Sequence, residues 1–329
     1  MSDLVAIESI NLTKSFAAGQ VAVSGLDLRI APGTVYGLVG RNGAGKSTAL
    51  RLLMGLLRPD QGSARILGNN LWQADRSQRS RIGYVAQRQL LPGRMSLEDL
   101  GRYVGRFYED WDHLKWHSLV KRWGMNLKVA VGRMSGGEQR KAALLLAIHA
   151  MPQVLILDEP AAGLDSVARR ELLDLLIELI QLRPETTLLI STHHIGDLAR
   201  IAQEVGMMDR GRLLRTAQLD DLQERMKKVQ VVFPGSAPPA GFKLPGMISM
   251  ESVGPVVTAV CELDSDKLLE EWRQQSQLRV QTFPLSLEEI FLELFENTQW
   301  RSEANEASAN SESQFGGIYE EESQSNEWH

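Results

Sequence analysis

The residues with the clearest chemical capacity form the stretch GRNGAGKS, Gly40 to Ser47. Its three glycines let the backbone take conformations that a side chain would forbid, so that successive N–H groups can converge on phosphate oxygens. Lys46 can then meet the outer phosphates as a point charge, and Ser47 can offer a hydroxyl oxygen to Mg²⁺. A glycine-rich turn that simply starts a helix is the competing interpretation. The stretch follows an apolar run, Val35 to Val39, and precedes a helical one, Thr48 to Leu53, and this order favours a phosphate cradle that binds a nucleotide.

Two acidic residues end the second informative stretch, VLILDEP. The four apolar residues Val154 to Leu157 are typical of a strand that is buried on both faces. Asp158 can hold the Mg²⁺ that Ser47 contacts, while Glu159, one residue further along, can polarise a water aimed at the terminal phosphate. The alternative is an acidic strand end that begins a turn at Pro160. Because the cradle is present, we favour the metal-and-base interpretation.

A second candidate anion site lies between these two stretches, in MSGGEQRK. Ser135 is a good helix N-cap, and Gly136 and Gly137 expose N–H groups at the start of an apolar helix, Ala142 to Ala150. Phosphate is favoured at such a position by the unpaired donors and by the helix dipole. Ser-Gly-Gly also occurs in ordinary loops, but its position shortly before the acid-ended strand favours a phosphate receptor.

With these motifs in order, the chain resembles the ATP-binding subunit of an ABC (ATP-binding cassette) transporter over about residues 4–228. GRNGAGKS matches the phosphate loop of that family, and VLILDE matches its metal-and-base strand. The signature turn has Met134 in place of the commoner leucine and Glu138 in place of the commoner glutamine. Gln87 in YVAQ matches the lid glutamine, and His193 in ISTHH matches the switch histidine. No motif residue is degenerate, so the resemblance implies a site competent for hydrolysis.

The resemblance implies a set of site residues and two bound species, ATP and Mg²⁺. Catalysis is assigned to Glu159, His193 and Gln87, and the metal to Ser47, Gln87 and Asp158. Phe16 stands where the family stacks an aromatic ring on adenine. The implied nucleotide contacts are Phe16, Gly40, Asn42, Gly43, Gly45, Lys46, Ser47, Thr48, Ser135, Gly136, Gly137 and Glu138.

Taken singly, three of these residues have simpler interpretations. Gln87 could be a surface residue in a loop after the expected strand Arg81 to Ala86. Phe16 could be part of the core, although a ring on an adenine face is equally suitable. His193 could be a strand-end histidine after the expected strand Thr187 to Ser191. Gln87 is selected by its position after the strand Arg81 to Ala86, and stacking is favoured for Phe16. Only the family spacing selects His193 over the adjacent His194.

The pattern of the elements predicts an α/β fold, a P-loop NTPase of the ABC type. We expect N-terminal antiparallel strands, a mostly parallel sheet core and a helical subdomain at about 95–150, together forming an ATP-binding domain over 1–228. Trp111, Trp116 and Trp123 in the helical part are most simply core residues, although exposed aromatics would suit contact with a membrane subunit. A small C-terminal α+β domain over 229–298 and an acidic, disordered tail over 299–329 complete the predicted organisation.

The region after residue 228 changes to short strands and helices without visible chemistry. The predicted elements are strands Val229 to Phe233, Met247 to Ser252 and Val256 to Leu263, and helices Asp266 to Gln275 and Ser286 to Phe295. The segment PLSLEEIFLELF also resembles the C-terminal end of ATPases that pair with ABC-2-type membrane subunits, mostly exporters. An amphipathic helix that closes the small domain is the simpler interpretation.

Composition places limits on the compartment and on the partners. The chain has 329 residues and a net charge of −5. The tail from Arg301 carries −6, from seven glutamates and one arginine, and the residues before it carry +1. The near-neutral remainder argues against nucleic acid as the main partner. Cys261 is the only cysteine, which excludes an internal disulfide. MSDLVAIESI lacks a basic start, and no apolar run approaches about eighteen residues, so we expect neither a secretory signal nor a membrane helix.

The resemblance implies partners that the chain lacks. In the family, two ATPase subunits join head to tail around two nucleotides, so the partner is a second copy or a close paralogue. A separate transmembrane permease subunit would hold the chain at the cytoplasmic face of the membrane. The alternative function is a non-transport ABC ATPase in repair or translation, but such proteins usually carry a coiled-coil insertion or a second cassette. A non-catalytic scaffold is disfavoured by Glu159 and His193.

Overall fold

A computed structural model describes residues 5–16, 19–88, 91–234, 238–239, 241–263 and 278–296. The chain divides into two compact units, Met1–Leu219 and Asp220–His329. The predicted helix Asp266 to Gln275 and the acidic tail lie outside the described residues.

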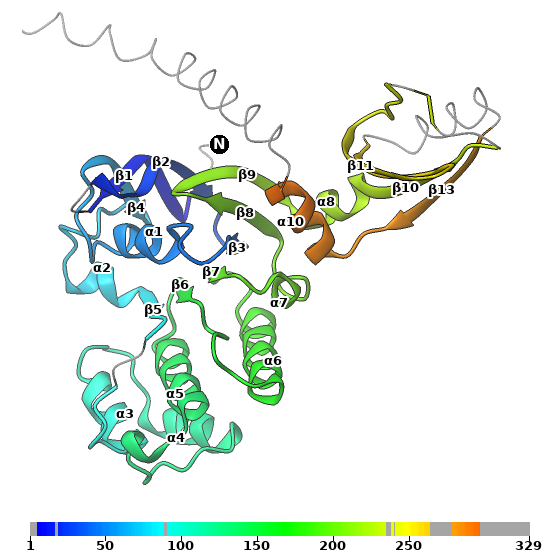
Figure 1. Cartoon of the computed structure of the whole chain (residues 1–329). Helices are drawn as coiled ribbons and strands as arrows, with labels where there is room; N and C mark the ends of the chain where they lie inside the picture. The colour runs from blue at the N-terminus through cyan, green and yellow to red at the C-terminus, as the bar shows by residue number, and fades with distance from the viewer. Residues whose placement is uncertain are drawn as a thin grey trace, which may run out of the picture. The chain divides into compact units, whose positions relative to one another are not determined.

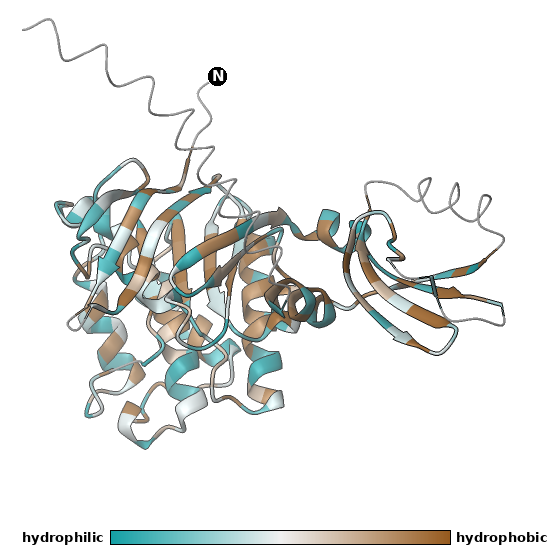
Figure 2. Cartoon of the chain, turned by 45° about the horizontal axis from the view of Figure 1, so that its top comes forward, coloured by the Kyte–Doolittle hydropathy of each residue, from teal (hydrophilic) through white to brown (hydrophobic). Residues whose placement is uncertain are grey.

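Six strands form the central sheet of the first unit, in the order β5-β6-β7-β3-β8-β9 (Figure 1). Their bounds are β3 Val35–Val39, β5 Ile82–Val85, β6 Val154–Asp158, β7 Thr187–Thr192, β8 Glu204–Asp209 and β9 Arg212–Gln218. Only β9 is antiparallel to its neighbour. Strands β3, β6 and β7 are buried along their whole length, and hydrophobic colour runs along the central strands in Figure 2. The predicted mostly parallel core is therefore confirmed.

A second, antiparallel sheet and one helix complete the nucleotide-facing part of this unit. The sheet has the order β2-β1-β4, with bounds β1 Ile7–Ser15, β2 Val21–Ile30 and β4 Gln61–Ile66. Helix α1, Lys46–Leu53, contributes Leu50 and Leu53 to a fully buried cluster. Leu12 and Leu26 of the antiparallel sheet and Tyr36 of β3 lie in the same cluster. Burial from both sides therefore fixes α1 against the sheet that carries the cradle.

The helical part contains α3, α4 and α5, which pack on one another (Figure 1). The remaining bounds are α2 Arg76–Ser80, α3 Leu97–Gly105, α4 His113–Arg122, η2 Val131–Arg133, α5 Gly136–His149, α6 Ser166–Leu182 and α7 Ile195–Leu198. Trp116 is 0% exposed, and its indole N–H donates to the carbonyl of Leu97 at 3.1 Å. Trp111 and Trp123 are half-buried. Core packing is thus the role of Trp116. Within the described parts of the chain, no helix is both long and apolar enough to cross a membrane.

The second unit is built on a four-stranded antiparallel sheet in the order β11-β12-β10-β13. The elements are α8 Leu219–Arg225, β10 Met226–Val232, β11 Met247–Val253, β12 Val256–Glu262, β13 Arg279–Pro284 and α10 Leu287–Glu296. Val229, Val231, Val257 and Ala259 belong to its apolar cluster. Strand β13 has no counterpart among the predicted elements, because five of its six residues are exposed and it lacks an apolar alternation. Strand β10 begins at Met226, which already pairs with Glu262 of β12.

A close approach in the helical part gives a stability prediction. A Cβ atom at Gly101 would lie 2.2 Å from Nε1 of the buried Trp116, so a side chain there must displace a ring that has no room to move. We expect Gly101→Leu to lower the free energy of unfolding by about 1–3 kcal/mol, as overpacked cores do.

The matched control is Arg102→Leu, which places the same side chain on the exposed face of the same helix. It should change stability by no more than about 0.5 kcal/mol. Urea unfolding followed by tryptophan fluorescence measures both variants. Equal midpoints for the two would show that Trp116 does not constrain α3.

Candidate functional site

The cradle between β3 and α1 has the geometry of an open anion site. Gly45 is the N-cap of α1 with φ 103°, and Gly43 has φ 83°. A Cβ at Gly45 would also lie 2.2 Å from the carbonyl oxygen of Ala22, so glycine is required there on two counts. No side chain caps α1. Its first N–H groups and its dipole are therefore available to an anion.

Lys46 and Glu159 form a buried ion pair at the start of α1. The ammonium of Lys46 lies 3.1 Å from Oε1 of Glu159 and donates to the carbonyl of Gly40 at 2.7 Å. Lys46 is 5% exposed and Glu159 is 3% exposed. Burial of one of these charges without the other would cost several kcal/mol, so each holds its partner in place.

Asp158 sits at the centre of a hydrogen-bonded cluster. The hydroxyls of Ser47 and Ser191 both donate to its Oδ1, at 2.8 and 2.7 Å. Asp158 is 1% exposed, and among the described residues its Oδ2 has no hydrogen-bond partner. A buried carboxylate oxygen without a partner is costly, and it indicates that something binds there.

This arrangement fits Mg²⁺. The unpartnered Oδ2 of Asp158 and the hydroxyl of Ser47 are oxygen atoms of two residues that are in contact in the structure. Mg²⁺ prefers oxygen ligands of this kind. Over the described ranges no group of three or more His, Cys, Asp or Glu residues could hold a metal ion. A cation held by two protein oxygens would complete its octahedron with phosphate oxygens and water, the usual pattern for this ion.

Glu159 is held between Lys46 and His193. Its second oxygen, Oε2, lies 2.8 Å from Nδ1 of His193, which donates because a carboxylate only accepts. Its backbone is in the left-handed region, φ 49°, and its N–H donates to the carbonyl and to the hydroxyl oxygen of Ser191, each at 3.0 Å. Strain of this kind is typical of functional positions. The neighbouring His194 has its pKa lowered, by burial first and by the charge of His193 next, so it stays neutral beside the site.

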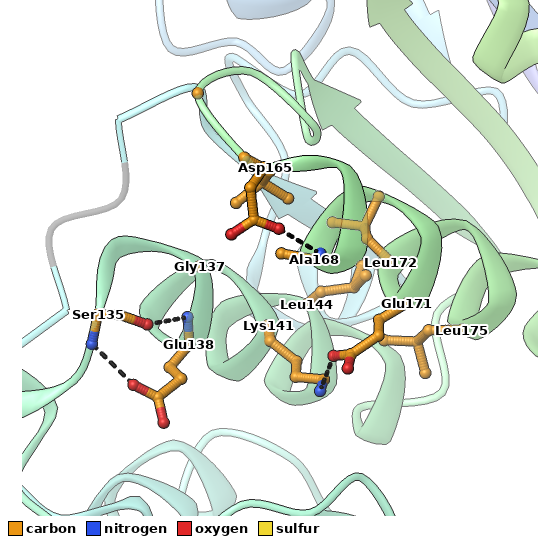
Figure 3. Close-up of a pocket in the computed structure, with 12 residues that line it drawn as sticks. Ser135, Gly137, Glu138, Lys141, Leu144, Asp165, Ala168, Glu171, Leu172 and Leu175 are labelled. Carbon is orange, nitrogen blue, oxygen red and sulfur yellow. Dashed lines mark hydrogen bonds and ion pairs between the residues drawn. The ribbon is translucent and has the colours of Figure 1, made fainter.

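The Ser135 turn, unlike the cradle, is capped by its own side chains, which satisfy two of its N–H donors. Ser135 is the N-cap of α5, and its hydroxyl accepts from the N–H of Glu138 at 3.2 Å. In return, Oε2 of Glu138 accepts from the N–H of Ser135 at 2.8 Å, which completes a capping box (Figure 3). The hydrogen bond from the Ser135 N–H first, and the one from the Ser135 side chain next, lower the pKa of the Glu138 carboxyl. The turn lines one end of a pocket of about 200 Å³ between α5 and α6 that also includes Asp165.

The structure unites some of the predicted site residues and leaves others apart. Lys46, Ser47, Asp158, Glu159 and His193 form one connected cluster. Among the described residues, no side-chain hydrogen bond or ion pair joins this cluster to Phe16, Asn42, Thr48, Gln87 or the Ser135 turn. Phe16 is 47% exposed, which leaves a ring face open, and Asn42 is exposed. The carbonyl of Gln87 accepts a hydrogen bond from Arg140 at 3.2 Å.

Two residues that support the site were not predicted. Ser191 holds the carboxylate of Asp158 and the N–H of Glu159 together, and it is a fully buried hydroxyl that follows three apolar residues of β7. Its polarity at the end of that strand is the signal that could have selected it. Arg140 donates to the carbonyls of Ala162 and Gln87 and so links the two loops. No local signal distinguishes this arginine from the others.

Comparisons with known proteins identify relatives of this chain. A family model described as ABC transporter matches residues 23–162. The Nod factor export ATP-binding protein I of Sinorhizobium fredii (strain NBRC 101917 / NGR234) is 33% identical over 299 residues, covering 88% of this chain and 86% of that protein. The daunorubicin/doxorubicin resistance ATP-binding protein of Streptomyces peucetius is 33% identical over 229 residues, covering 67% and 68%.

The fold has counterparts among solved structures. A dimeric ATP-binding cassette in a post-hydrolysis state, bound to ADP and Pi, superposes with a TM-score of 0.58 at 24% identity. The superposition covers 65% of this chain and 98% of that one. With the phosphate cradle, the acid-ended strand and these relatives together, the chain belongs to the ATP-binding subunits of ABC transporters, the ATPases that drive transport.

Proposed function

We propose that this chain binds ATP with Mg²⁺ in the cradle and hydrolyses it with Glu159 as the base, within a dimer that drives an exporter. The observation that supports this most directly is the buried cluster of Lys46, Ser47, Asp158, Glu159 and His193, which brings an ammonium, two oxygen groups suited to Mg²⁺ and a second carboxylate together at one cradle. His193 orients Glu159 through its Nδ1 hydrogen bond.

ATP changes the electrostatics of this cluster. The outer phosphates of ATP replace Glu159 as the negatively charged partner of Lys46. Glu159 then keeps His193 as its partner and accepts a proton from the attacking water through Oε1. Ser47 and Asp158 would hold Mg²⁺, with Gln87 as a third ligand, and the metal would supply charge neutralisation for the phosphates. Phe16 offers its exposed face to adenine.

The dimer supplies the second half of each site. The remaining cradle contacts are Gly40, Asn42, Gly43, Gly45 and Thr48. The Ser135 turn, with Gly136 and Gly137, receives the outer phosphate of the nucleotide held by a second subunit, and Glu138 caps this turn. A cassette of the same fold is dimeric with ADP and Pi bound, which supports this proposal. ATP carries the outer phosphate and ADP lacks it, so the triphosphate favours the closed pair and hydrolysis releases it.

A membrane permease is the second partner, and it would hold the chain at the cytoplasmic face. The relatives named above are ATP-binding proteins for Nod factor export and for daunorubicin/doxorubicin resistance, which supports an exporter over a repair or translation factor. Affinity purification of the tagged full chain from membranes, followed by mass spectrometry, tests this proposal. Recovery of an integral membrane protein in stoichiometric amount is expected, and recovery of ribosomal or DNA-repair proteins instead would contradict it.

Lys46→Ala tests the cradle. Removal of the ammonium deletes the main positive charge for the outer phosphates, so the Kd for a fluorescent ATP analogue should rise at least about tenfold, as loss of a charged contact predicts. The control is Lys115→Ala, whose side chain is 79% exposed on α4. Unchanged affinity in Lys46→Ala would count against the cradle.

Glu159→Gln tests the base. The amide keeps the size of the side chain but cannot accept the proton, so turnover should fall by about 10²–10⁴-fold while ATP binding persists. Phosphate release measures turnover, and light scattering of the ATP-loaded variant should show a trapped dimer. The control is Glu178→Gln, an acid of α6 paired with Arg122 away from the cradle. Near-parental hydrolysis by Glu159→Gln would remove Glu159 from the mechanism.

A further inference from the structure

The two helix N-termini assigned to phosphate differ in one respect that the family resemblance did not predict. Helix α1 begins without any side-chain cap, so its donors are open. Helix α5 begins with a complete capping box, in which the carboxylate of Glu138 already occupies the N–H of Ser135. The receptor for the second phosphate contact therefore carries an anion of its own.

Glu138 keeps its negative charge in this position. Its hydrogen bonds to Ser135 lower its pKa, so it is ionised at neutral pH. The nearest lysine on the same helix, Lys141, places its ammonium 2.6 Å from Glu171 and over the ring of Trp123 at 5.7 Å. Arg140 donates to the carbonyls of Ala162 and Gln87. Among the described residues Glu138 forms no ion pair, and the charge of Lys141 contributes to its lowered pKa only after the hydrogen bonds to Ser135.

The turn is sterically open to a phosphate. A Cβ built on Gly136 would meet no atom within 4 Å, and one on Gly137 would make only ordinary contacts, the nearest at 3.5 Å. Glu138 is itself exposed. What opposes an incoming phosphate is thus the negative charge of Glu138, not lack of space.

We propose that Glu138 is a built-in competitor of the outer phosphate, which weakens ATP-driven closure of the dimer and favours its reopening. This inference rests on the proposed function, since it concerns the same phosphate receptor. A phosphate that binds the N–H groups of Gly136 and Gly137 approaches the like charge of the Glu138 carboxylate, which is bound to the N–H of the adjacent Ser135. In a symmetric dimer both turns carry this cost.

Glu138→Gln isolates the charge. Glutamine serves as well as glutamate at this position of a capping box, so the helix start is retained while the charge is removed. In a Glu159→Gln background, which prevents turnover, dimer formation is followed by light scattering over an ATP titration. The double variant should reach half-dimerisation at about fivefold lower ATP, because a repulsion of about one unit charge at each turn is absent.

A matched control and a salt series separate the charge from general effects. Glu171→Gln in the same background removes a carboxylate from the other end of the same pocket and should leave the ATP midpoint close to that of the parent. The Glu138→Gln advantage should shrink between about 0.05 and 0.5 M salt, because exposed charges are screened. Thermal melting confirms that each variant is folded.

The ATP midpoints of the variants decide whether the inference holds. An unchanged ATP midpoint for Glu138→Gln would overturn the inference, and so would a shift that is independent of salt. A higher midpoint would show that the carboxylate contributes to nucleotide binding, for example by accepting from a ribose hydroxyl, and would also overturn it. Absence of any ATP-dependent dimer in the Glu159→Gln parent would overturn the dimer proposal and this inference together.

Discussion

Parallel pairing of β3, β6 and β7 is the constraint on which the rest of the site depends. In the register of β6 and β7, Asp158 stands opposite Ser191. In the register of β3 and β7, Val39 stands opposite Thr192, so the cradle leaves the sheet at the same edge. A slip of one residue would turn every side chain to the other face of the sheet. The hydrogen bonds among Ser47, Asp158 and Ser191 exist only because three strand ends meet there.

Electrostatic interactions then determine how the charged side chains of the site are paired in the structure. A lysine and a glutamate that are both almost fully buried need each other, because either charge alone would be costly in a low-dielectric interior. Lys46 and Glu159 therefore neutralise each other in this structure. In the proposed function a phosphate would compete for the lysine, and the pairing keeps Glu159, the proposed base, beside that lysine.

The other polar contacts of the unit connect this site to its surroundings. Arg140 lies on α5, the helix that begins at the Ser135 turn, and it donates to the loop after β5 and to the loop after β6. A change at either loop thus acts on the same helix. Trp116 in turn holds α4 against α3, so that the helical part moves as a packed group.

The sequence by itself determined the local features: the strand-loop-helix order of the cradle, the acid-ended strand and the N-cap of α5. These depend on residues close along the chain, where glycine conformation, apolar runs and capping preferences act directly. It also determined the family, because several such motifs occur in order.

Only the tertiary structure decided which of these features touch. Three sets of contacts join residues that are far apart along the chain: the pairing of Lys46 with Glu159, the support from Ser191 and the link through Arg140. No local sequence pattern therefore predicts these contacts. The exposed strand β13 was missed for a related reason, since it is defined by its pairing with β10 rather than by its own composition. Long-range partners are set by strand register and core packing, and these arise only when the whole unit folds.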